Sequence, residues 1–423
     1  MSEPDVSNLM RVDEAIAIMD AAPVQPRTME VPLAEAQGLV LAEDLLADRD
    51  YPPFDKALMD GWAVHCADAA KAPVDLAVVG EVSAGQVSTR PISRGEAMGI
   101  TTGSPLPRGA DGVVPVEDSQ RPEGSAGEAK VRILRASAPD RYVCPAGTET
   151  RSGQVVLRKG ARLEAAQLAL AAMVGRAKIN VFAAPRVGIL ATGDELVSYD
   201  TVPGPAQIRN TNSLMVMALL RRTNCQAIDL GLVGDEKELI RRKITDGLRL
   251  DALVISGGMS VGKHDHIPSL LRELGAQLKT TKLRIKPGKP FIFASMDQAK
   301  LPAPQTPPGL CYIFGLPGNP LSGFVCIVRL ASRVLSRMAG SNPSERWITG
   351  RLLSPLPANG PREFYQPVAF EIAADGTCSV RPLTWKGSAD LVALASADGL
   401  LKRSENESPL PEGAGVKILD IRC

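Results

Sequence analysis

The chain has 423 residues, of which 44% are hydrophobic and 22% are charged, so it is long enough for several domains and apolar enough to bury a core. Its 48 basic residues nearly balance its 47 acidic residues, and only 4% of residues are aromatic. These figures exclude wholesale disorder and argue against a general nucleic-acid binder, which needs a basic surface or stacking aromatic side chains.

The seven cysteines are isolated in the sequence and form no CxxC pair, which favours reduced thiols over disulfides or a zinc site. No apolar run has the length of a membrane span, and the first ten residues contain acids rather than an apolar core. We therefore expect a soluble, cytoplasmic protein with no membrane partner.

The first third of the chain predicts one helix followed by a β-rich unit. Apolar residues recur at helical spacing over 12–22, and Pro23 ends this pattern. Short β-branched runs at 76–79, 113–116 and 130–134 are separated by Gly and Pro turns, as in a small β domain. A second helix is then predicted at 163–174, ending at Gly175.

From residue 183 onward, predicted strands alternate with predicted helices, which is typical of a parallel sheet in a three-layer α/β domain. We expect the first helix of this domain to be capped near Asn212. From about residue 347, short strands and turns return and predict a second β domain, which we expect to be a barrel. The strands of the α/β domain are predicted at 187–190, 227–233, 252–255 and 312–314, and its helices at 213–222, 236–248, 268–274 and 321–338.

Ligands of open parallel sheets bind beyond the carboxyl ends of the strands, so the loops that follow the predicted strands are the candidate site. A single Gly-rich turn is an ordinary connection, but four such loops at one edge favour a binding site. Ser256, Gly257 and Gly258 offer accessible backbone N–H groups that suit phosphate, although neither a Walker A loop nor a dinucleotide fingerprint is present. The loop 315–320, which contains Pro317, Gly318 and Asn319, runs into a helix whose start favours anions.

The segment 286–290 holds two lysines in a turn stiffened by two prolines and a glycine. A rigid backbone lowers the entropic cost of directing Lys286 and Lys289 toward one anion. A solvated basic turn is an equally weighted reading, because most lysine pairs lie in water.

Acidic residues fall in or after the same strand-end loops, where carboxylates commonly hold Mg²⁺ near phosphate. For Asp235, capping of the following helix is the alternative role. The two histidines that flank Asp265 suggest a surface loop more than a transition-metal site, because a His₃ site would need every histidine in the chain. The acids concerned are Asp194, Glu195, Asp235 and Asp265.

Several motifs occur together in one order, and as an ordered set they are far more specific than any one of them. With them the chain resembles the MoeA family of molybdopterin molybdenumtransferases, which includes the E domain of gephyrin. The likeness spans nearly the whole chain. The motifs are MDGWAV at 59–64, TGSPLP at 102–107, TGDEL at 192–196, SGGMSVG at 256–262 followed by Asp265, KPGKP at 286–290 and GLPGNP at 315–320.

The resemblance implies a subunit of four parts. These are a helical linker from residues 1–50 and 140–182, an inserted β-rich part at 51–139, an α/β molybdopterin-binding-like part at 183–340 and a C-terminal β-barrel at 341–423. It also implies a homodimer in which each cleft lies between the α/β and C-terminal parts of one subunit and the inserted part of the other.

The implied reaction inserts molybdenum from molybdate into adenylylated molybdopterin, with Mg²⁺-dependent release of AMP. The implied partners are a molybdopterin adenylyltransferase and molybdoenzyme acceptors, and Glu195 and Asp265 are the implied metal ligands. The implied catalytic residues are Asp60, Thr102, Glu195, Asp235 and Asp265. The implied substrate-binding residues are Lys286, Lys289, Ser256, Gly257, Gly258, Pro317, Gly318, Asn319 and Ser388.

The sequence departs from the family pattern at four places. Gln366 stands where the family usually has Arg, and this weakens the cationic pocket unless Arg362 or Lys386 substitutes. The other departures are Glu149 and Asn210 in place of Asp, and Lys56-Ala57-Leu58 in place of Asn-Ser-Ala. A pterin-binding or scaffold paralogue is therefore an alternative. A second is an adenylyltransferase, which the length of the chain disfavours.

Overall fold

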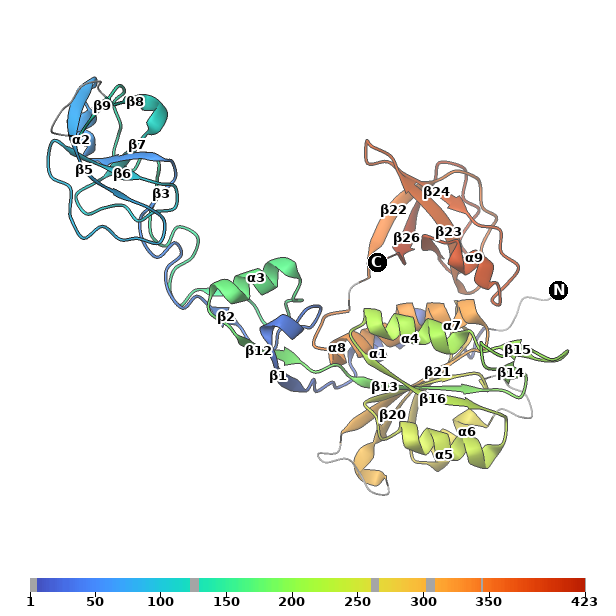
Figure 1. Cartoon of the computed structure of the whole chain (residues 1–423). Coiled ribbons are helices and arrows are strands. Elements are labelled where there is room, and N and C mark those ends of the chain that lie inside the picture. Colours follow the sequence, from blue (N-terminus) through green and yellow to red (C-terminus); the bar gives the residue numbers. More distant parts are fainter. Residues whose placement is uncertain (1–5, 122–128, 260–265, 302–308, 344, 423) are drawn as a thin grey trace. The chain divides into compact units, whose positions relative to one another are not determined.

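The computed structural model of the chain describes residues 6–121, 129–259, 266–301, 309–343 and 345–422 (Figure 1). Contacts divide the chain into two compact units. Unit 1 comprises Met1–Val31, Gly38–Ala42 and Asn180–Cys423, and unit 2 comprises Pro32–Gln37 and Glu43–Ile179. The fold is the α/β multidomain architecture that the sequence predicts.

Unit 1 is built around a six-stranded sheet with the strand order β16-β13-β17-β21-β20-β18. The first four strands are parallel, as predicted, but β20 and β18 run antiparallel to their neighbours. The predicted parallel sheet thus contains one reversed strand, β20, and β18 again runs in the direction of the four parallel strands; β18 and β20 can pair antiparallel because no crossover helix joins them. Their bounds are β13 (Arg186–Thr192), β16 (Gln226–Val233), β17 (Ala252–Ser256), β18 (Gln277–Lys282), β20 (Pro290–Asp297) and β21 (Leu310–Leu316).

Helices cover both faces of this sheet and give it three layers (Figure 1). On one face, Val187, Val254 and Phe314 of the sheet pack in one apolar core with helices α1, α4, α7 and α8. On the other face, Leu253 and Ile255 pack with α5 and α6. Alternate residues of one strand thus serve two cores, as a doubly covered sheet requires. The helices are α1 (Val12–Asp20), α4 (Asn212–Arg222), α5 (Lys237–Gly247), α6 (Ile267–Glu273), α7 (Pro320–Cys326) and α8 (Ser332–Met338).

One helix differs from its prediction. The long helix predicted at 321–338 is α7 and α8 joined by a π-helical segment, Ile327–Ala331. The first helix, α1, packs on α8 and the π-helical segment, within unit 1. Its buried residues Val12, Ala15 and Met19 form one face, which explains this packing.

The C-terminal part is a closed β-barrel, as predicted. Its strand order is β23-β24-β22-β26-β25, and β25 pairs back with β23. The short strand β19 (Ile285–Lys286) joins this barrel by pairing with β23, and the next strand, β20, belongs to the α/β sheet. The barrel elements are β22 (Trp347–Leu352), β23 (Glu363–Ile372), β24 (Cys378–Pro382), α9 (Leu391–Ala395), β25 (Gly399–Arg403) and β26 (Gly415–Asp420).

Unit 2 contains the predicted β-rich part and the linker. Its six-stranded sheet has the order β7-β4-β6-β5-β9-β8 and encloses apolar cores around Trp62 and Met98. The linker holds one α-helix, α3 (Ala165–Met173), and the short strand pairs β2–β11 and β3–β10. The sheet strands are β4 (Gly61–Val64), β5 (Val74–Val82), β6 (Glu96–Ile100), β7 (Gly112–Pro115), β8 (Ser119–Gln120) and β9 (Lys130–Ile133); the linker strands are β2 (Leu45–Leu46), β3 (Lys56–Ala57), β10 (Val143–Cys144) and β11 (Val155–Leu157).

Strands β1 (Thr28–Pro32) and β12 (Lys178–Phe182) pair where the chain passes from one unit to the other. Among the described residues, no helix combines the length and the apolar character that crossing a bilayer requires.

Candidate functional site

The loops after β13 and β16 meet at the carboxyl edge of the sheet. The carboxylate Oδ1 of Asp194 accepts a hydrogen bond from the backbone N–H of Asp235 at 2.9 Å. The side chain of Glu195 folds over Gly193, where a Cβ atom would lie 2.5 Å from Glu195 Oε2. Asp235 does not cap α5, because the N-cap residue is Glu236 and no side chain caps that end. Asp194, Glu195 and Asp235 thus lie in the loops that follow two adjacent strands.

The loop after β17 lies directly against the end of β13. Gly257 has φ +99°, and a Cβ atom there would lie 2.2 Å from the carbonyl oxygen of Thr192. Only glycine combines that backbone conformation with so close an approach. The loop therefore carries no side chain at this position, which leaves room for a phosphate beside it. The backbone N–H of Gly257 itself donates to the carbonyl oxygen of Leu316 at 3.2 Å. Ser256, at the end of β17, is buried.

Asn212 links the loops that follow β17 and β21. Its Nδ2 donates to Ser256 Oγ at 2.9 Å and to the carbonyl oxygen of Gly318 at 2.7 Å. A cap of α4 was predicted near Asn212; the N-cap residue is Thr211, which makes no capping bond with its side chain, and the neighbouring Asn210 supplies a side-chain bond to the first turn. Asn210 Oδ1 accepts the backbone N–H of Ser213 at 3.2 Å, and Asn210 Nδ2 donates to the Ser213 hydroxyl at 2.8 Å. Asn212 was not among the predicted site residues.

The loop after β21 also contacts the C-terminal part. Asn319 Nδ2 donates to Ser388 Oγ at 2.8 Å, and the backbone N–H of Leu321 donates to the carbonyl oxygen of Ser388 at 3.1 Å. Asn319 is the N-cap residue of α7 but makes no capping bond with its side chain, which serves Ser388 instead. The structure thus brings Ser256, Gly318, Asn319 and Ser388 into one hydrogen-bonded group, with Asn212 between them.

Lys286 lies against two aromatic rings at the junction of the barrel and the α/β sheet. Its Nζ is 4.6 Å from the ring centre of Phe364 and 5.9 Å from that of Trp385. Burial lowers the pKa of Lys286, and the positive charge of Arg362 lowers it further. Lys289, at the other end of the turn, is exposed. Within the described ranges, no carboxylate forms an ion pair with either lysine, so their charges remain available to a bound anion.

Arg362 is the second cation of this cluster. Its guanidinium is close enough to act on Lys286 electrostatically, and burial lowers the pKa of Arg362 itself. Gln366, where the family usually has Arg, lies half-buried on β23. Phe364 and Trp385 could not be identified from the sequence, because their role depends on pairing between β19 and β23.

Unit 2 holds the remaining predicted residues. Asp60 Oδ1 accepts the backbone N–H of Thr102 at 2.6 Å and its hydroxyl at 2.7 Å. These two bonds stabilise the carboxylate and lower the pKa of Asp60. Lys56 and Glu149, two of the departures from the family pattern, face each other, with Lys56 Nζ 3.8 Å from Glu149 Oε1.

The oxygen donors at the sheet edge fit Mg²⁺, which binds carboxylates and keeps most of its water ligands. Glu195 is exposed beside Gly193, with no described ion pair to a cation. Its predicted companion Asp265 lies outside the described residues. Over the described ranges, no group of three His, Cys, Asp or Glu side chains is placed to hold a metal ion. A site with one or two protein carboxylates is compatible with this observation.

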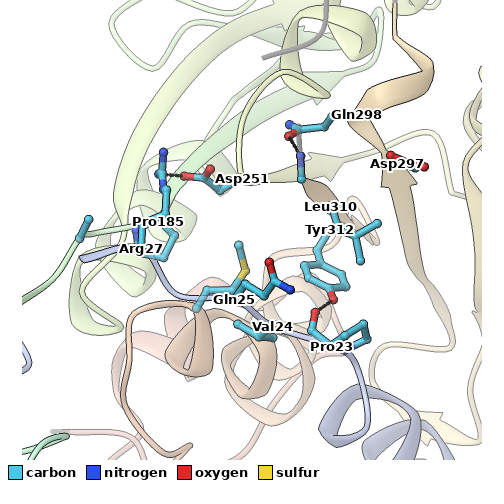
Figure 2. Close-up of a pocket in the computed structure, with 13 residues that line it drawn as sticks. Pro23, Val24, Gln25, Arg27, Pro185, Asp251, Asp297, Gln298, Leu310 and Tyr312 are labelled. Atoms are coloured by element: carbon cyan, nitrogen blue, oxygen red, sulfur yellow. Dashed lines mark hydrogen bonds and ion pairs between the residues drawn. The ribbon is translucent and has the colours of Figure 1, made fainter. Parts of the chain in front are cut away.

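A cavity of about 470 Å³ lies at the opposite edge of the same sheet (Figure 2). Asp251 immediately precedes β17 and Tyr312 is near the start of β21, so this cavity faces the amino ends of the parallel strands. Arg27 pairs with Asp251 at 2.5 Å, and the Tyr312 hydroxyl donates to the carbonyl oxygen of Pro23. None of the predicted site residues lines this cavity.

Comparison with known families divides the chain into three matched regions. Residues 10–175 match the MoeA N-terminal region (domain I and II), residues 188–337 match a probable molybdopterin binding domain, and residues 349–421 match the MoeA C-terminal region (domain IV). Together these regions include every element that carries the candidate site.

Individual relatives agree with the family match. The molybdopterin molybdenumtransferase of Haemophilus influenzae is 31% identical over 78% of this chain and 78% of its own. That of Bacillus subtilis is 30% identical over 97% of this chain and 94% of its own. A crystal structure of the molybdopterin biosynthesis moea protein from Pyrococcus horikosii superposes with a TM-score of 0.82, at 29% identity, over 98% of this chain and 100% of that one. The chain belongs to the MoeA family of molybdopterin molybdenumtransferases.

Proposed function

We propose that this chain inserts molybdenum from molybdate into adenylylated molybdopterin, in a Mg²⁺-dependent reaction that releases AMP. In this reaction water would cleave the phosphoanhydride to give AMP and the phosphorylated pterin. The two dithiolene sulfurs would bind molybdenum, and their two protons would leave with one oxygen of molybdate as water. The observation that carries the proposal is Lys286, partly buried against the rings of Phe364 and Trp385 and without an ion-pair partner among the described carboxylates. A partly buried cation without a counter-charge favours a bound anion, and the positive charge of Arg362, which lowers the pKa of Lys286, strengthens this preference.

The proposal assigns two anion subsites to the hydrogen-bonded group. Ser256, Gly257 and Gly258 would bind the phosphate of the pterin, because they offer the Ser256 hydroxyl and, at the two glycines, a chain without side chains at the end of β17. Lys286, Lys289 and Ser388 would bind molybdate, with Arg362 in place of the family arginine. Pro317, Gly318 and Asn319 would hold the two subsites together, because Asn319 bonds to Ser388 and Gly318 to Asn212.

The acidic residues would act on the phosphoanhydride. Glu195 and Asp265 would hold Mg²⁺, which when bound neutralises negative charge on the phosphates. Asp235 would support the loop of Asp194 and Glu195, to which its backbone is bonded. Asp60, kept ionised by its bonds to Thr102, would orient a proton-bearing group of the substrate.

The inserted β-rich part carries Asp60 and Thr102, and we propose that it completes the cleft of a second subunit in a homodimer. Cytoplasmic location, and encounters with an adenylyltransferase and with molybdoenzyme acceptors, complete the proposal. None of these assignments requires nucleic acid or a membrane.

AMP release tests the proposal directly. Purified protein is mixed with adenylylated molybdopterin, molybdate and Mg²⁺, and AMP is measured beside the active cofactor formed. We expect both products in the wild type and a loss of about a hundredfold in rate for Lys286→Ala, the usual effect of removing one preorganised charge. Absence of AMP, while a relative works in parallel, contradicts the enzymatic function.

Gln366 favours one alternative, a paralogue that binds the pterin without turning it over, because the usual arginine is missing there. The same assay separates the two. Tight pterin binding without AMP release supports the alternative, and restoration of turnover by Gln366→Arg would identify the cause.

A further inference from the structure

Two asparagine–serine pairs recur at the candidate site. Asn212 Nδ2 donates to Ser256 Oγ at 2.9 Å, and Asn319 Nδ2 donates to Ser388 Oγ at 2.8 Å. The pairs are connected, because Asn212 also bonds to the carbonyl oxygen of Gly318, the residue that precedes Asn319. A single chain of side-chain amides thus runs from the end of β17 to the C-terminal part.

The orientation of the Asn212 amide is fixed by its neighbours. A carbonyl oxygen can only accept a hydrogen bond, so the nitrogen of Asn212 must face Gly318. Its Oδ1 is consequently turned the other way, where it is buried and has no hydrogen-bond partner among the described residues. A buried acceptor without a partner is unusual in a folded protein, and it shows that the two bonds donated by the Asn212 nitrogen determine how this amide is oriented.

The hydrogen bonds that the two asparagine amides donate leave the serine hydroxyls able to act as donors. A serine hydroxyl has one proton, and an oxygen that already accepts an amide N–H keeps this proton free to donate. In the part of the chain that the structure describes, neither the Ser256 nor the Ser388 hydroxyl has another partner. Each therefore presents a proton, and an oxyanion is the natural acceptor for two hydroxyl donors at the edge of the sheet where the glycine loop lies.

We propose that Asn212 and Asn319 are positioning residues that hold the hydroxyls of Ser256 and Ser388 as hydrogen-bond donors toward a tetrahedral oxyanion. This rests on the proposed function, in which phosphate and molybdate are the two anions. The asparagines act through the serines and do not touch the anion themselves.

A double-mutant cycle tests the proposal on the full chain, with molybdate and inorganic phosphate as separate probes in equilibrium dialysis. In Asn212→Asp the carboxylate can only accept, so the Ser256 proton turns toward it and is lost to the anion. Introduced into the wild-type protein, Ser256→Ala is expected to weaken the binding of at least one probe about tenfold. Introduced into the Asn212→Asp variant, the same substitution is expected to weaken binding less than about twofold. Added negative charge alone would leave the tenfold effect intact.

The second pair provides an independent cycle. Asn319 is exposed and Ser388 is half-buried, so substitutions there should disturb folding less than Asn212→Asp does. If Asn212→Asp does not fold, Asn319→Asp and Ser388→Ala therefore provide the same comparison. Ser396→Ala is the matched control, because that hydroxyl is exposed and donates to the carbonyl oxygen of Val392. It should bind both probes as the wild type does.

The outcomes are distinct. The positioning role is overturned if each serine substitution weakens anion binding equally in the wild type and in the corresponding asparagine variant. It is also overturned if neither serine substitution changes the binding of molybdate or of phosphate. Coupled cycles in a protein that releases no AMP from adenylylated molybdopterin support the positioning role and contradict the proposed function. AMP release together with additive cycles supports the proposed function and removes the positioning role alone.

Discussion

Lys286 and Phe364 are register partners across β19 and β23, and the Lys286 ammonium lies 4.6 Å from the centre of the Phe364 ring. The turn that follows Lys286 returns at Pro290 into the α/β sheet. One short segment therefore belongs to both the barrel and the sheet, and the lysine sits where they join. Its position depends on a backbone pairing as well as on its own stiff turn.

Replacement of Phe364 by Leu should weaken molybdate binding roughly fivefold, because a cation–π contact contributes about 1 kcal/mol and Lys286 becomes more mobile without it. Equilibrium dialysis measures the change. Phe370→Leu is the control: Phe370 is equally buried on the same strand and carries Arg422 over its ring at 4.0 Å. A similar loss of affinity in both variants would mean that barrel stability, and not the lysine contact, is responsible.

Oxyanion binding should be accompanied by proton uptake at pH values between the lowered pKa of Lys286 in the free protein and its higher pKa in the complex. Burial and Arg362 lower the pKa of Lys286, and a bound anion raises it again because it favours the charged form. Calorimetry in two buffers of different ionisation enthalpy measures the uptake. Lys286→Arg, which stays protonated, should abolish it, whereas Lys289→Arg should not.

The lowered pKa of Lys286 should also make the stability of the protein depend on pH. A lysine whose pKa is lowered on folding binds fewer protons in the native than in the unfolded chain. The free energy of unfolding should therefore rise with pH between the native pKa and 10.5, and this slope should be absent in Lys286→Met.

Arg362→Gln should weaken molybdate binding about tenfold or more and raise the pKa of Lys286, because it removes both an anion contact and the repulsion between the two cations. Less proton uptake is therefore expected on binding. Arg381→Gln, an exposed change on β24, is the control. Unchanged affinity in Arg362→Gln would show that Arg362 does not replace the arginine missing at Gln366.

The sequence predicts the strand-end loops well, because alternating strands and helices force the ends of parallel strands to one edge. The sequence does not place Asn212 in the site, because an asparagine at the start of a helix is most simply interpreted as a cap. The bond of Asn212 to Gly318 joins segments that are far apart in the sequence, and no local pattern predicts it. The reversed direction of β20 is not predicted for a similar reason: strand direction depends on the connection and not on the apolar pattern. The aromatic surroundings of Lys286 need the β19–β23 register, which no local pattern contains.

Asp60→Asn should lower AMP release while unit 2 stays folded. The neutral amide oxygen still accepts the bonds from Thr102, but more weakly than a carboxylate does. Because these bonds lower the pKa of Asp60, the carboxylate contributes at pH values above its ordinary pKa of 3.8, and its contribution is lost as pH falls through the native value. Asp75→Asn is a matched control in unit 2, exposed and bonded to Arg132. Equal rates in both variants would remove Asp60 from the catalytic set.

The buried guanidinium of Arg329 holds the barrel on the α/β part. Arg329 lies in the π-helical segment, donates to the hydroxyl of Tyr365 and forms an ion pair with Glu345. Its guanidinium carbon lies 5.2 Å from the ring centre of Trp347 and 5.4 Å from that of Tyr365. Only 4% of the side chain is exposed, so its charge is almost fully desolvated and depends on these partners.

Arg329→Met should lower the free energy of unfolding by about 3 kcal/mol, because it leaves Glu345 with a buried charge that is only partly compensated by Arg333. Urea unfolding measures the loss, and Arg351→Met, an exposed change on β22, should cost little. The double variant Arg329→Met, Glu345→Gln should lose less than the sum of the two single changes, because the second removes the charge that the first leaves unpaired. Additive losses would contradict the pairing. Because β23 also carries Phe364, looser attachment of the barrel should weaken molybdate binding even where the protein is still folded.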